Sequence, residues 1–381
     1  MVLDCISKID MKELKGTIHN LNTGALGVIT RNNRSRLFRK DYILVSDQFD
    51  TVKAGYVATI TTHSLETSRA YLKVDSLKEF EDGDVVSIDK DGSVVFLYER
   101  NSSHNAILAT ELCNHRCIMC PQPPVCREKS RTAFNKKLIS LFDPSTQEVG
   151  ITGGEPTMLG DELFDLIHSI QKHTPKAAIS ILSNGVRFAD LSYARKLASC
   201  NHFDLQVDVP IFSDIPSKHN KIVGAQTFYK TVQGLYNLAK CRVRIGIRIV
   251  IHKQTYKRLP QFAEYIYRNF PFVSQVAFMQ MEMMGLALEN KDEVWIDPYE
   301  YRNELEKAIL HLADRGMNPL IFNSQLCILP KTIWQYAYRS ISSWKDIYID
   351  ECIGCSFQEQ CAGFFSANKN WHSKHICKFN V

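Results

Sequence analysis

From residue 104 onward, short apolar segments alternate with longer amphipathic ones, and this alternation limits the possible folds more than any other feature. Segments such as NAILATE and FDLQVDVP have the composition of buried strands, whereas AQTFYKTVQGLYNLAK has apolar residues at helical spacing. About six such strand–helix units predict a parallel sheet with right-handed crossovers. The predicted fold class is α/β, with a fully or partly closed barrel whose functional residues lie at the carboxyl ends of the strands.

The first hundred residues follow a different pattern. Residues 1–102 contain short β-rich segments separated by turn sequences such as EDGD and DKDG, which predicts a small all-β barrel or sandwich. The DG pairs on both sides of DVVSI predict a hairpin there. We therefore expect three parts: a β-rich domain at 1–102, the strand–helix core at 103–322, and a cysteine-rich segment at 323–381.

The composition is that of a globular protein, with 45% hydrophobic and 23% charged residues among 381. No apolar run approaches the ~18 residues of a transmembrane helix, and the start of the sequence lacks the pattern of a secretory signal. We expect a cytoplasmic protein that does not bind membranes. The net charge of +5 is locally concentrated in one segment, which contains Arg31, Arg34, Arg36, Arg39 and Lys40. We interpret this segment as a solvated loop, or alternatively as a docking surface for an acidic peptide or nucleic acid.

The twelve cysteines do not predict a disulfide framework, because the cytoplasm keeps thiols reduced. Many of them cluster at the spacing of metal ligands, which indicates metal binding. The first group lies in a loop and consists of Cys113, Cys117 and Cys120. The second group lies near the end of the sequence and consists of Cys352, Cys355 and Cys361. Four others are interpreted as bystanders or small buried side chains: Cys5, Cys126, Cys200 and Cys241.

The first group has the pattern C-x3-C-x2-C and directly follows the first strand of the core. Three thiolates on one short loop can hold a cubane iron–sulfur cluster and leave one iron free for the amino and carboxylate groups of S-adenosylmethionine. Cys126 is poorly spaced to be a fourth ligand. Zinc is the alternative, with His115 as a further ligand, but the odd spacing argues against it.

TGGEP follows the second strand of the core. Gly153 and Gly154 allow the backbone to approach a ligand closely, and the carboxylate of Glu155 is an acceptor suited to an ammonium group. Placed one strand after the cysteine loop, this turn fits the amino group of S-adenosylmethionine.

The CNHRCIMC loop, the GGEP turn and the partial-barrel pattern together resemble the radical S-adenosylmethionine (radical SAM) superfamily, which implies a partial (β/α)6 TIM-like barrel. The resemblance implies that the three loop cysteines ligate a [4Fe–4S] cluster and that Met119 packs near the adenine of S-adenosylmethionine. It further implies contacts to the nucleoside or to the methionine carboxylate from four residues: Ser183, Asn184, Asp208 and Arg248.

The second group, C-x2-C-x5-C, can hold another [4Fe–4S] cluster if a fourth thiolate joins it. Cys327 is favoured over Cys377 for this role because chain termini tend to fray, and a zinc ribbon is the alternative. The pattern resembles the SPASM or twitch domain of peptide-modifying radical enzymes. Since Phe365 stands where the two-cluster version continues with cysteine, we expect one auxiliary cluster.

The β-rich start, PQPP after the loop, and the CILP and CIGC segments together look like the His-Xaa-Ser system radical SAM maturase family (HxsC-like). This resemblance implies a peptide maturase that cleaves S-adenosylmethionine to a 5′-deoxyadenosyl radical and abstracts hydrogen from a ribosomally synthesised peptide or small protein (RiPP). The implied partners are the precursor peptide, a second radical SAM maturase and a flavodoxin- or ferredoxin-type reductant. The β-rich domain is expected to recognise the substrate or the partner.

Two other functions remain open from the sequence. One is a radical SAM enzyme that acts on a small molecule or nucleoside, in which an auxiliary cluster is often lacking. The other is a non-catalytic zinc protein whose basic segment binds nucleic acid, a partner that we do not expect here.

Overall fold

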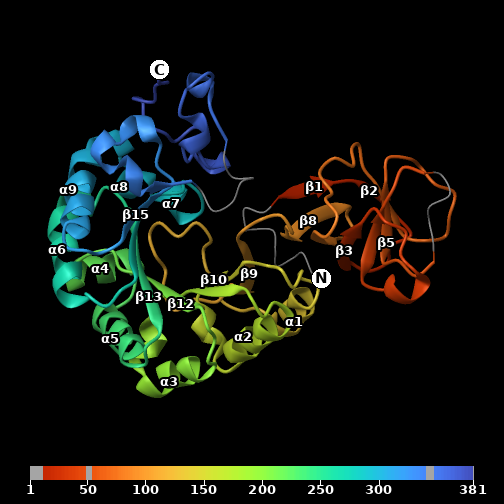
Figure 1. Cartoon of the computed structure of the whole chain (residues 1–381), viewed down its shortest axis with the longest axis horizontal. Coiled ribbons are helices and arrows are strands. Elements are labelled where there is room, and N and C mark those ends of the chain that lie inside the picture. Colours follow the sequence, from red (N-terminus) through yellow and green to blue (C-terminus); the bar gives the residue numbers. More distant parts are fainter. Residues whose placement is uncertain (1–11, 49–53, 340–346, 381) are drawn as a thin grey trace. The chain divides into compact units, whose positions relative to one another are not determined.

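The computed structural model describes residues 12–48, 54–339 and 347–380, whose strands form two eight-stranded sheets (Figure 1). Internal contacts divide the chain into two compact units. The second unit comprises Leu108–Lys129, Ile151–Phe164 and Ile179–Val381, and so contains both the predicted cysteine loop and the cysteine-rich end. The bystander Cys5 and the whole SISSWK segment lie outside the described residues.

The first sheet has the strand order β1-β8-β7-β3-β4-β5-β6-β2. Its two end strands are consecutive in the sequence and are separated by a single residue, Gly16, so that the segment pairs with β8 on one side and with β6 on the other. This closes the sheet into the small all-β barrel that the sequence predicts. The strands are β1 (Glu13–Lys15), β2 (Thr17–His19), β3 (Ala25–Thr30), β4 (Tyr42–Val45), β5 (Ala58–Thr61), β6 (Tyr71–Lys73), β7 (Val85–Ile88) and β8 (Ser93–Tyr98).

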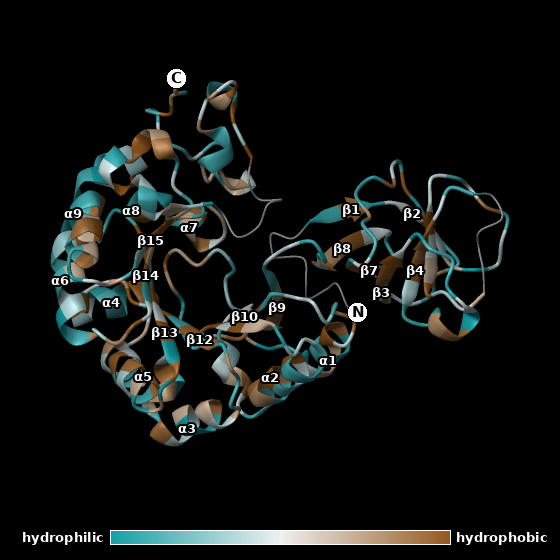
Figure 2. Ribbon diagram, viewed as in Figure 1, coloured by the Kyte–Doolittle hydropathy of each residue, from teal (hydrophilic) through white to brown (hydrophobic). Residues whose placement is uncertain are grey.

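The barrel folds because alternating residues of these strands are apolar and meet in one interior. Ile29, Ile43, Ile60 and Leu72 are completely buried there, and Figure 2 shows hydrophobic colours along β3 and β8. The predicted hairpin is confirmed, since β7 and β8 pair antiparallel across the DKDG turn.

Two glycines make the closure of the barrel possible. The Gly16 N–H donates to the Gly92 carbonyl over 2.9 Å. Gly92 has a φ of +85°, and a Cβ atom there would lie 1.9 Å from the Gly16 carbonyl oxygen. A side chain at Gly92 would therefore be strained by its backbone conformation and would also collide with the opposite strand.

The second sheet follows the order of the chain, from β9 to β16, and each pair from β11 to β16 is parallel. This confirms the predicted α/β class. The strands are β9 (Asn105–Thr110), β10 (Glu148–Gly153), β11 (Ala178–Leu182), β12 (Leu205–Pro210), β13 (Arg244–Ile251), β14 (Gln275–Gln280), β15 (Pro319–Phe322) and β16 (Ala337–Tyr338).

The helices of the second unit cover one face of this sheet. Figure 1 shows α3, α5, α6 and α9 along the convex outer side of the curved strands. Their apolar sides pack against strand residues such as Val207, Ile247 and Phe278, which are completely buried. The helices of the second unit are α3 (Leu191–Ser199), α4 (Pro216–Val223), α5 (Phe228–Lys240), α6 (Leu259–Asn269), α7 (Leu286–Glu289), α8 (Lys291–Val294) and α9 (Arg302–Ala313). Helix α1 (Thr132–Ile139) and most of α2 (Glu162–His173) belong to the first unit.

Two details differ from the sequence prediction. The segment that begins with WIDP contains a short 3-10 turn, Pro298–Tyr301, before α9 begins at Arg302. Helix α4 was not predicted, although Pro216 at its first turn and Gly224 just after its end are the usual boundary signals. Within the described residues, no helix is long and apolar enough to cross a membrane.

We expect Gly92→Ala to destabilise the barrel by about 2–4 kcal/mol, because it combines a left-handed backbone penalty with a steric clash. Gly55→Ala is the matched control in the same barrel, since its φ is +95° but its Cβ would approach no atom closer than 3.5 Å. Hydrogen exchange of barrel peptides, followed by mass spectrometry, measures both. Equal effects of the two substitutions would contradict the role of the close approach.

Candidate functional site

The cysteine loop leaves the end of β9 and is tied back to it at its far end. The Glu128 carboxylate accepts a hydrogen bond from the Glu111 N–H at 2.9 Å and another from the Thr110 hydroxyl. The Val125 N–H donates to the Glu111 carbonyl at 3.2 Å. The loop is therefore closed at its base, and its cysteines lie on a segment with both ends held.

The middle of the loop is held by backbone groups of two helices. Arg116 and Ile118 donate their N–H groups to the carbonyls of Val223 and Ile222, at the end of α4, both at 2.9 Å. At the start of α7, the Leu286 N–H donates to the Cys120 carbonyl at 2.9 Å. The unpredicted helix α4 thus supplies one of the supports that give the cysteine loop its shape.

The three loop thiols are partly buried and lie close enough to influence one another. Burial, with smaller contributions from the neighbouring Glu155 and Cys120, raises the pKa of Cys113 to about 11. Burial likewise raises the pKa of Cys117, with additional contributions from Cys120 and Cys113. Thiols that resist ionisation without a positive partner are a donor set suited to metal, because bound iron stabilises the thiolate.

The three loop thiols are not arranged around a single metal ion. Among the described residues, no group of three or more His, Cys, Asp or Glu side chains converges closely enough to hold one metal ion. In a cubane cluster, by contrast, each thiolate binds a different iron.

His115 has a structural partner inside the loop. Its ring is 6% exposed, and its Nε2 lies 2.8 Å from the Thr227 hydroxyl. Burial lowers the pKa of His115 to about 4, so the ring is neutral at physiological pH. Under the zinc alternative, His115 would be a metal ligand. In the structure, the His115 side chain instead holds the loop to the start of α5.

Met119 points into a buried apolar cluster rather than into solvent. It is 4% exposed and packs with Phe212, Ile222, Met281 and Met283. The predicted contact with adenine remains a prediction. Cys126, at the loop exit, is exposed.

Gly153 and Gly154 permit a close backbone approach within the protein. A Cβ at Gly153, where φ is +147°, would lie 2.1 Å from the Thr110 carbonyl oxygen, and one at Gly154 would lie 2.2 Å from the Leu112 carbonyl oxygen. The Gly154 N–H donates to the Thr110 carbonyl at 2.7 Å. These glycines therefore press the end of β10 against the start of the cysteine loop, a reason for glycine that the sequence did not reveal.

Glu155 is the centre of a buried hydrogen-bond network. Its Oε1 accepts hydrogen bonds from the N–H and hydroxyl of Thr157 at 3.0 and 2.6 Å and from the Ser183 hydroxyl at 2.7 Å, while its Oε2 accepts the Asn184 N–H at 2.6 Å. Burial raises the pKa of this carboxyl, and the four donors oppose that shift. The carboxylate predicted to accept an ammonium group is thus occupied by protein donors and joins the end of β10 to that of β11.

The network continues to the cysteine loop. The Asn184 side chain donates to the side-chain Oδ1 of Asn114 at 2.6 Å and accepts the Val186 N–H at 3.0 Å. Ser183 and Asn184 therefore orient the loop through Glu155 and Asn114, and their contacts to S-adenosylmethionine remain predictions.

Asp208 and Arg248 lie on the same face of adjacent strands. Asp208 is 5% exposed and accepts hydrogen bonds from Gln206 and Gln275, at 2.9 and 3.3 Å. A Cβ at Gly246 would lie 2.0 Å from the Asp208 carboxylate, so glycine leaves room for this side chain on the next strand. Burial lowers the pKa of Arg248 and the charge of Asp208 opposes this effect.

The cysteine-rich end forms a second site. Five thiols line one pocket, which is partly open to solvent and which we call the cysteine cavity: Cys327, Cys352, Cys355, Cys361 and Cys377. Burial, with smaller contributions from the nearby thiols of Cys361, Cys377 and Cys352, raises the pKa of Cys327 to about 12. The sequence left Cys327 and Cys377 as alternatives, and the structure brings both to the cavity.

The segment around Cys377 is held in place. The Ser356 N–H donates to the Phe379 carbonyl at 3.0 Å, and the Phe379 N–H donates to the Cys355 sulfur at 3.5 Å. The Phe379 ring packs against Trp334 and Phe357, with ring centroids 5.3 and 5.6 Å away. Terminal fraying is therefore a weak reason to prefer Cys327.

We expect Glu155→Gln to destabilise the second unit by about 2–4 kcal/mol, because an amide NH₂ would then face donors that the carboxylate accepted. Glu300→Gln, on an exposed residue of the turn before α9, is the control. Thermal unfolding and iron content after reconstitution measure the effect. An unchanged midpoint for Glu155→Gln would show that the network does not support the loop.

Comparison with known proteins gives relatives of modest identity. The GTP 3′,8-cyclase of Desulforamulus reducens is 28% identical over 117 residues, covering 29% of this chain and 36% of the relative. That of Vibrio vulnificus is 24% identical over 200 residues, covering 49% and 57%. A probable GTP 3′,8-cyclase of Saccharolobus islandicus is 24% identical over 213 residues, covering 53% and 66%. The chain thus spans between about a third and two thirds of these relatives.

Two solved structures are also similar. Native anSMEcpe with bound AdoMet has a TM-score of 0.45 and 20% identity, covering 57% of this chain and 62% of its own. SuiB of Streptococcus suis bound to the precursor peptide SuiA has a TM-score of 0.48 and 14% identity, covering 62% and 51%. The family model for the radical SAM superfamily matches residues 107–266. This segment contains most of β9, the cysteine loop and the GGEP turn, so the similarity to the superfamily covers the part of the chain in which the candidate site lies.

Proposed function

We propose that this protein is a radical SAM peptide maturase that modifies a ribosomally synthesised peptide or small protein of the His-Xaa-Ser type. Family membership implies an iron–sulfur enzyme with a [4Fe–4S] cluster and S-adenosylmethionine. Cys113, Cys117 and Cys120 would hold the cluster. Together the cluster and S-adenosylmethionine supply, after one-electron reduction, a 5′-deoxyadenosyl radical that takes a hydrogen atom from the substrate.

The observation that carries the choice of substrate is the charge on the inner face of the sheet. Along the fully described strands β11–β15, strand pairing places Asp208, Gly246 and Gln275 in one row and Pro210, Arg248 and Ala277 in the next. One acid and one base therefore lie among neutral groups on one face of the sheet, in the middle of β12 and β13 and in the first half of β14. A peptide segment suits such a balanced surface, because peptide groups are polar but uncharged.

The nucleotide alternative is favoured by the curated relatives, which are GTP 3′,8-cyclases. A nucleoside triphosphate brings several negative charges, which proteins usually bind with clusters of Arg and Lys or with helix amino termini. The single Arg248 in these rows is weak support for a nucleoside triphosphate as the substrate.

Incubation with GTP and with a His-Xaa-Ser precursor peptide distinguishes the two substrates. We expect the mass of the peptide to change and GTP to remain unchanged.

The cysteine cavity supports an auxiliary cluster. Its lining is dominated by thiols and apolar side chains, including Phe357 and Phe379, a donor set suited to iron–sulfur binding in a shielded space. Four of the five thiols would ligate a [4Fe–4S] cluster, with either Cys327 or Cys377 completing the set. We propose that this cluster binds substrate or accepts an electron, and that the small β-barrel contributes to recognition of the substrate or of a second maturase.

The first prediction concerns the radical chemistry. The anaerobically reconstituted protein should form 5′-deoxyadenosine from S-adenosylmethionine when a reductant is added, because reduction of the cluster cleaves the sulfonium. Combined Cys→Ala changes at 113, 117 and 120 should abolish this product and remove about four irons per chain. Cys126→Ala, in the same loop, should change neither. Failure of a fully iron-loaded protein to form 5′-deoxyadenosine would refute the proposal.

The second prediction concerns the auxiliary cluster. The intact chain should bind about eight irons, and Cys352→Ala with Cys355→Ala should lower this to about four. Formation of 5′-deoxyadenosine without substrate should persist, because the loop cysteines are untouched. Cys241→Ala, a thiol outside the cavity, is the control. Bound zinc in place of the second set of irons would contradict the prediction and favour a zinc ribbon. Comparing Cys327→Ala with Cys377→Ala identifies the fourth ligand.

A further inference from the structure

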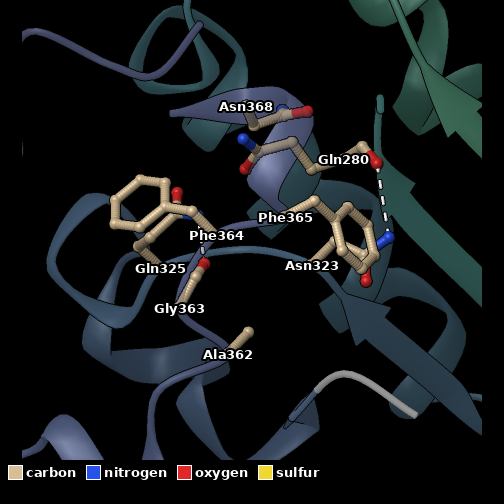
Figure 3. Close-up of a pocket in the computed structure, with 8 residues that line it drawn as sticks. All are labelled: Gln280, Asn323, Gln325, Ala362, Gly363, Phe364, Phe365 and Asn368. Atoms are coloured by element: carbon tan, nitrogen blue, oxygen red, sulfur yellow. Dashed lines mark hydrogen bonds between the residues drawn. The ribbon is translucent and has the colours of Figure 1, made fainter. Parts of the chain in front are cut away.

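A second recess lies at the carboxyl ends of β14 and β15, apart from the cysteine cavity. The recess lies between these strand ends and the segment 362–368, is partly open to solvent, and measures about 240 Å³ when the open space is counted (Figure 3). Eight residues line this recess, which we call the amide recess: Gln280, Asn323, Gln325, Ala362, Gly363, Phe364, Phe365 and Asn368. Four of them carry side-chain amides, and none carries a charge.

Several of these groups build the walls of the recess. The Asn368 side chain donates to the Met281 carbonyl at 3.0 Å and accepts the Met283 N–H at 2.9 Å, which fixes the segment 362–368 to the chain that follows β14. Asn323, with a φ of +62°, donates to the Gln280 carbonyl at 3.5 Å. Figure 3 shows the rings of Phe364 and Phe365 pointing in opposite directions from the backbone beside Gly363.

Two amide oxygens in this recess lack partners. Gln280 is 4% exposed and Gln325 is 2% exposed, and neither Oε1 has a hydrogen-bond partner among the described residues. The orientation of Gln325 is set by its Nε2, which donates to the Gly363 carbonyl at 2.6 Å, so that its oxygen faces away from that contact. A buried carbonyl without a donor is costly, and such groups in native proteins are rare unless something else satisfies them.

We propose that the amide recess binds a neutral side-chain carboxamide of the substrate. Its N–H groups would donate to Oε1 of Gln280 and Gln325, and its flat surface would pack against the apolar lining. The absence of charge in the lining selects against carboxylates and phosphates, which would be buried without a counter-charge. This inference rests on the proposed peptide substrate and places part of that substrate at the ends of β14 and β15.

Binding of two short probes to the cluster-loaded full chain tests the inference. We expect N-acetyl-Ala-Gln-Ala-amide to bind about tenfold more tightly than N-acetyl-Ala-Glu-Ala-amide in anaerobic calorimetry, because only the second buries a charge. Gln280→Met keeps the length of the side chain but removes its acceptor. It should weaken binding of the glutamine probe about tenfold and leave the thermal midpoint unchanged or higher, because a buried group without a partner is lost.

Gln261→Met, on an exposed position of α6, is the matched control and should change neither property. Absence of binding by the glutamine probe, or equal binding of both probes, would overturn the inference. Full retention of binding by Gln280→Met together with a lower midpoint would assign Gln280 a purely structural role. Formation of 5′-deoxyadenosine is measured on the same samples. If 5′-deoxyadenosine forms but neither probe binds, only the proposal for the amide recess is rejected. If the glutamine probe binds but no 5′-deoxyadenosine forms, only the proposed radical chemistry is rejected.

Discussion

The arrangement of the cysteine loop and of the strand ends beside it depends on one buried carboxylate. Glu155 accepts four hydrogen bonds from Thr157, Ser183 and Asn184, and Asn184 in turn bonds to Asn114 in the cysteine loop. Strand ends in a parallel sheet carry unpaired backbone groups, so a buried acceptor that gathers several donors can fix their relative positions. The ends of β10 and β11 and the cysteine loop are joined in this way.

Close backbone contact adds to this hydrogen bonding. Gly153 and Gly154 allow β10 to lie directly against Thr110 and Leu112, where any side chain would collide with a carbonyl oxygen. The end of α4 and the start of α7 hold the opposite side of the loop through backbone groups. The three thiols consequently lie on a loop that is supported from several directions, which is what a site for a bound cluster requires.

The cysteine-rich end uses a different principle. Hydrogen bonds between Ser356 and Phe379 and the packing of three aromatic rings bring the last residues of the chain to the cysteine cavity. Five thiols then share one space, although four suffice for a cluster. Their spacing of two and five residues was visible in the sequence, whereas the joint approach of Cys327 and Cys377 was not, because it depends on contacts between distant segments.

The sequence by itself determined the α/β class, the β-barrel and the three cysteines of the loop, because hydrophobic periodicity and ligand spacing are local properties of the chain. It also singled out Glu155, Ser183 and Asn184, but for contact with a ligand. Only the tertiary structure decided that their side chains bond to one another. It likewise decided that α4 supports the loop and that the amides of Gln280 and Gln325 meet in one recess. Such relations join residues tens of positions apart, and only the packing of the sheet brings them within hydrogen-bonding distance.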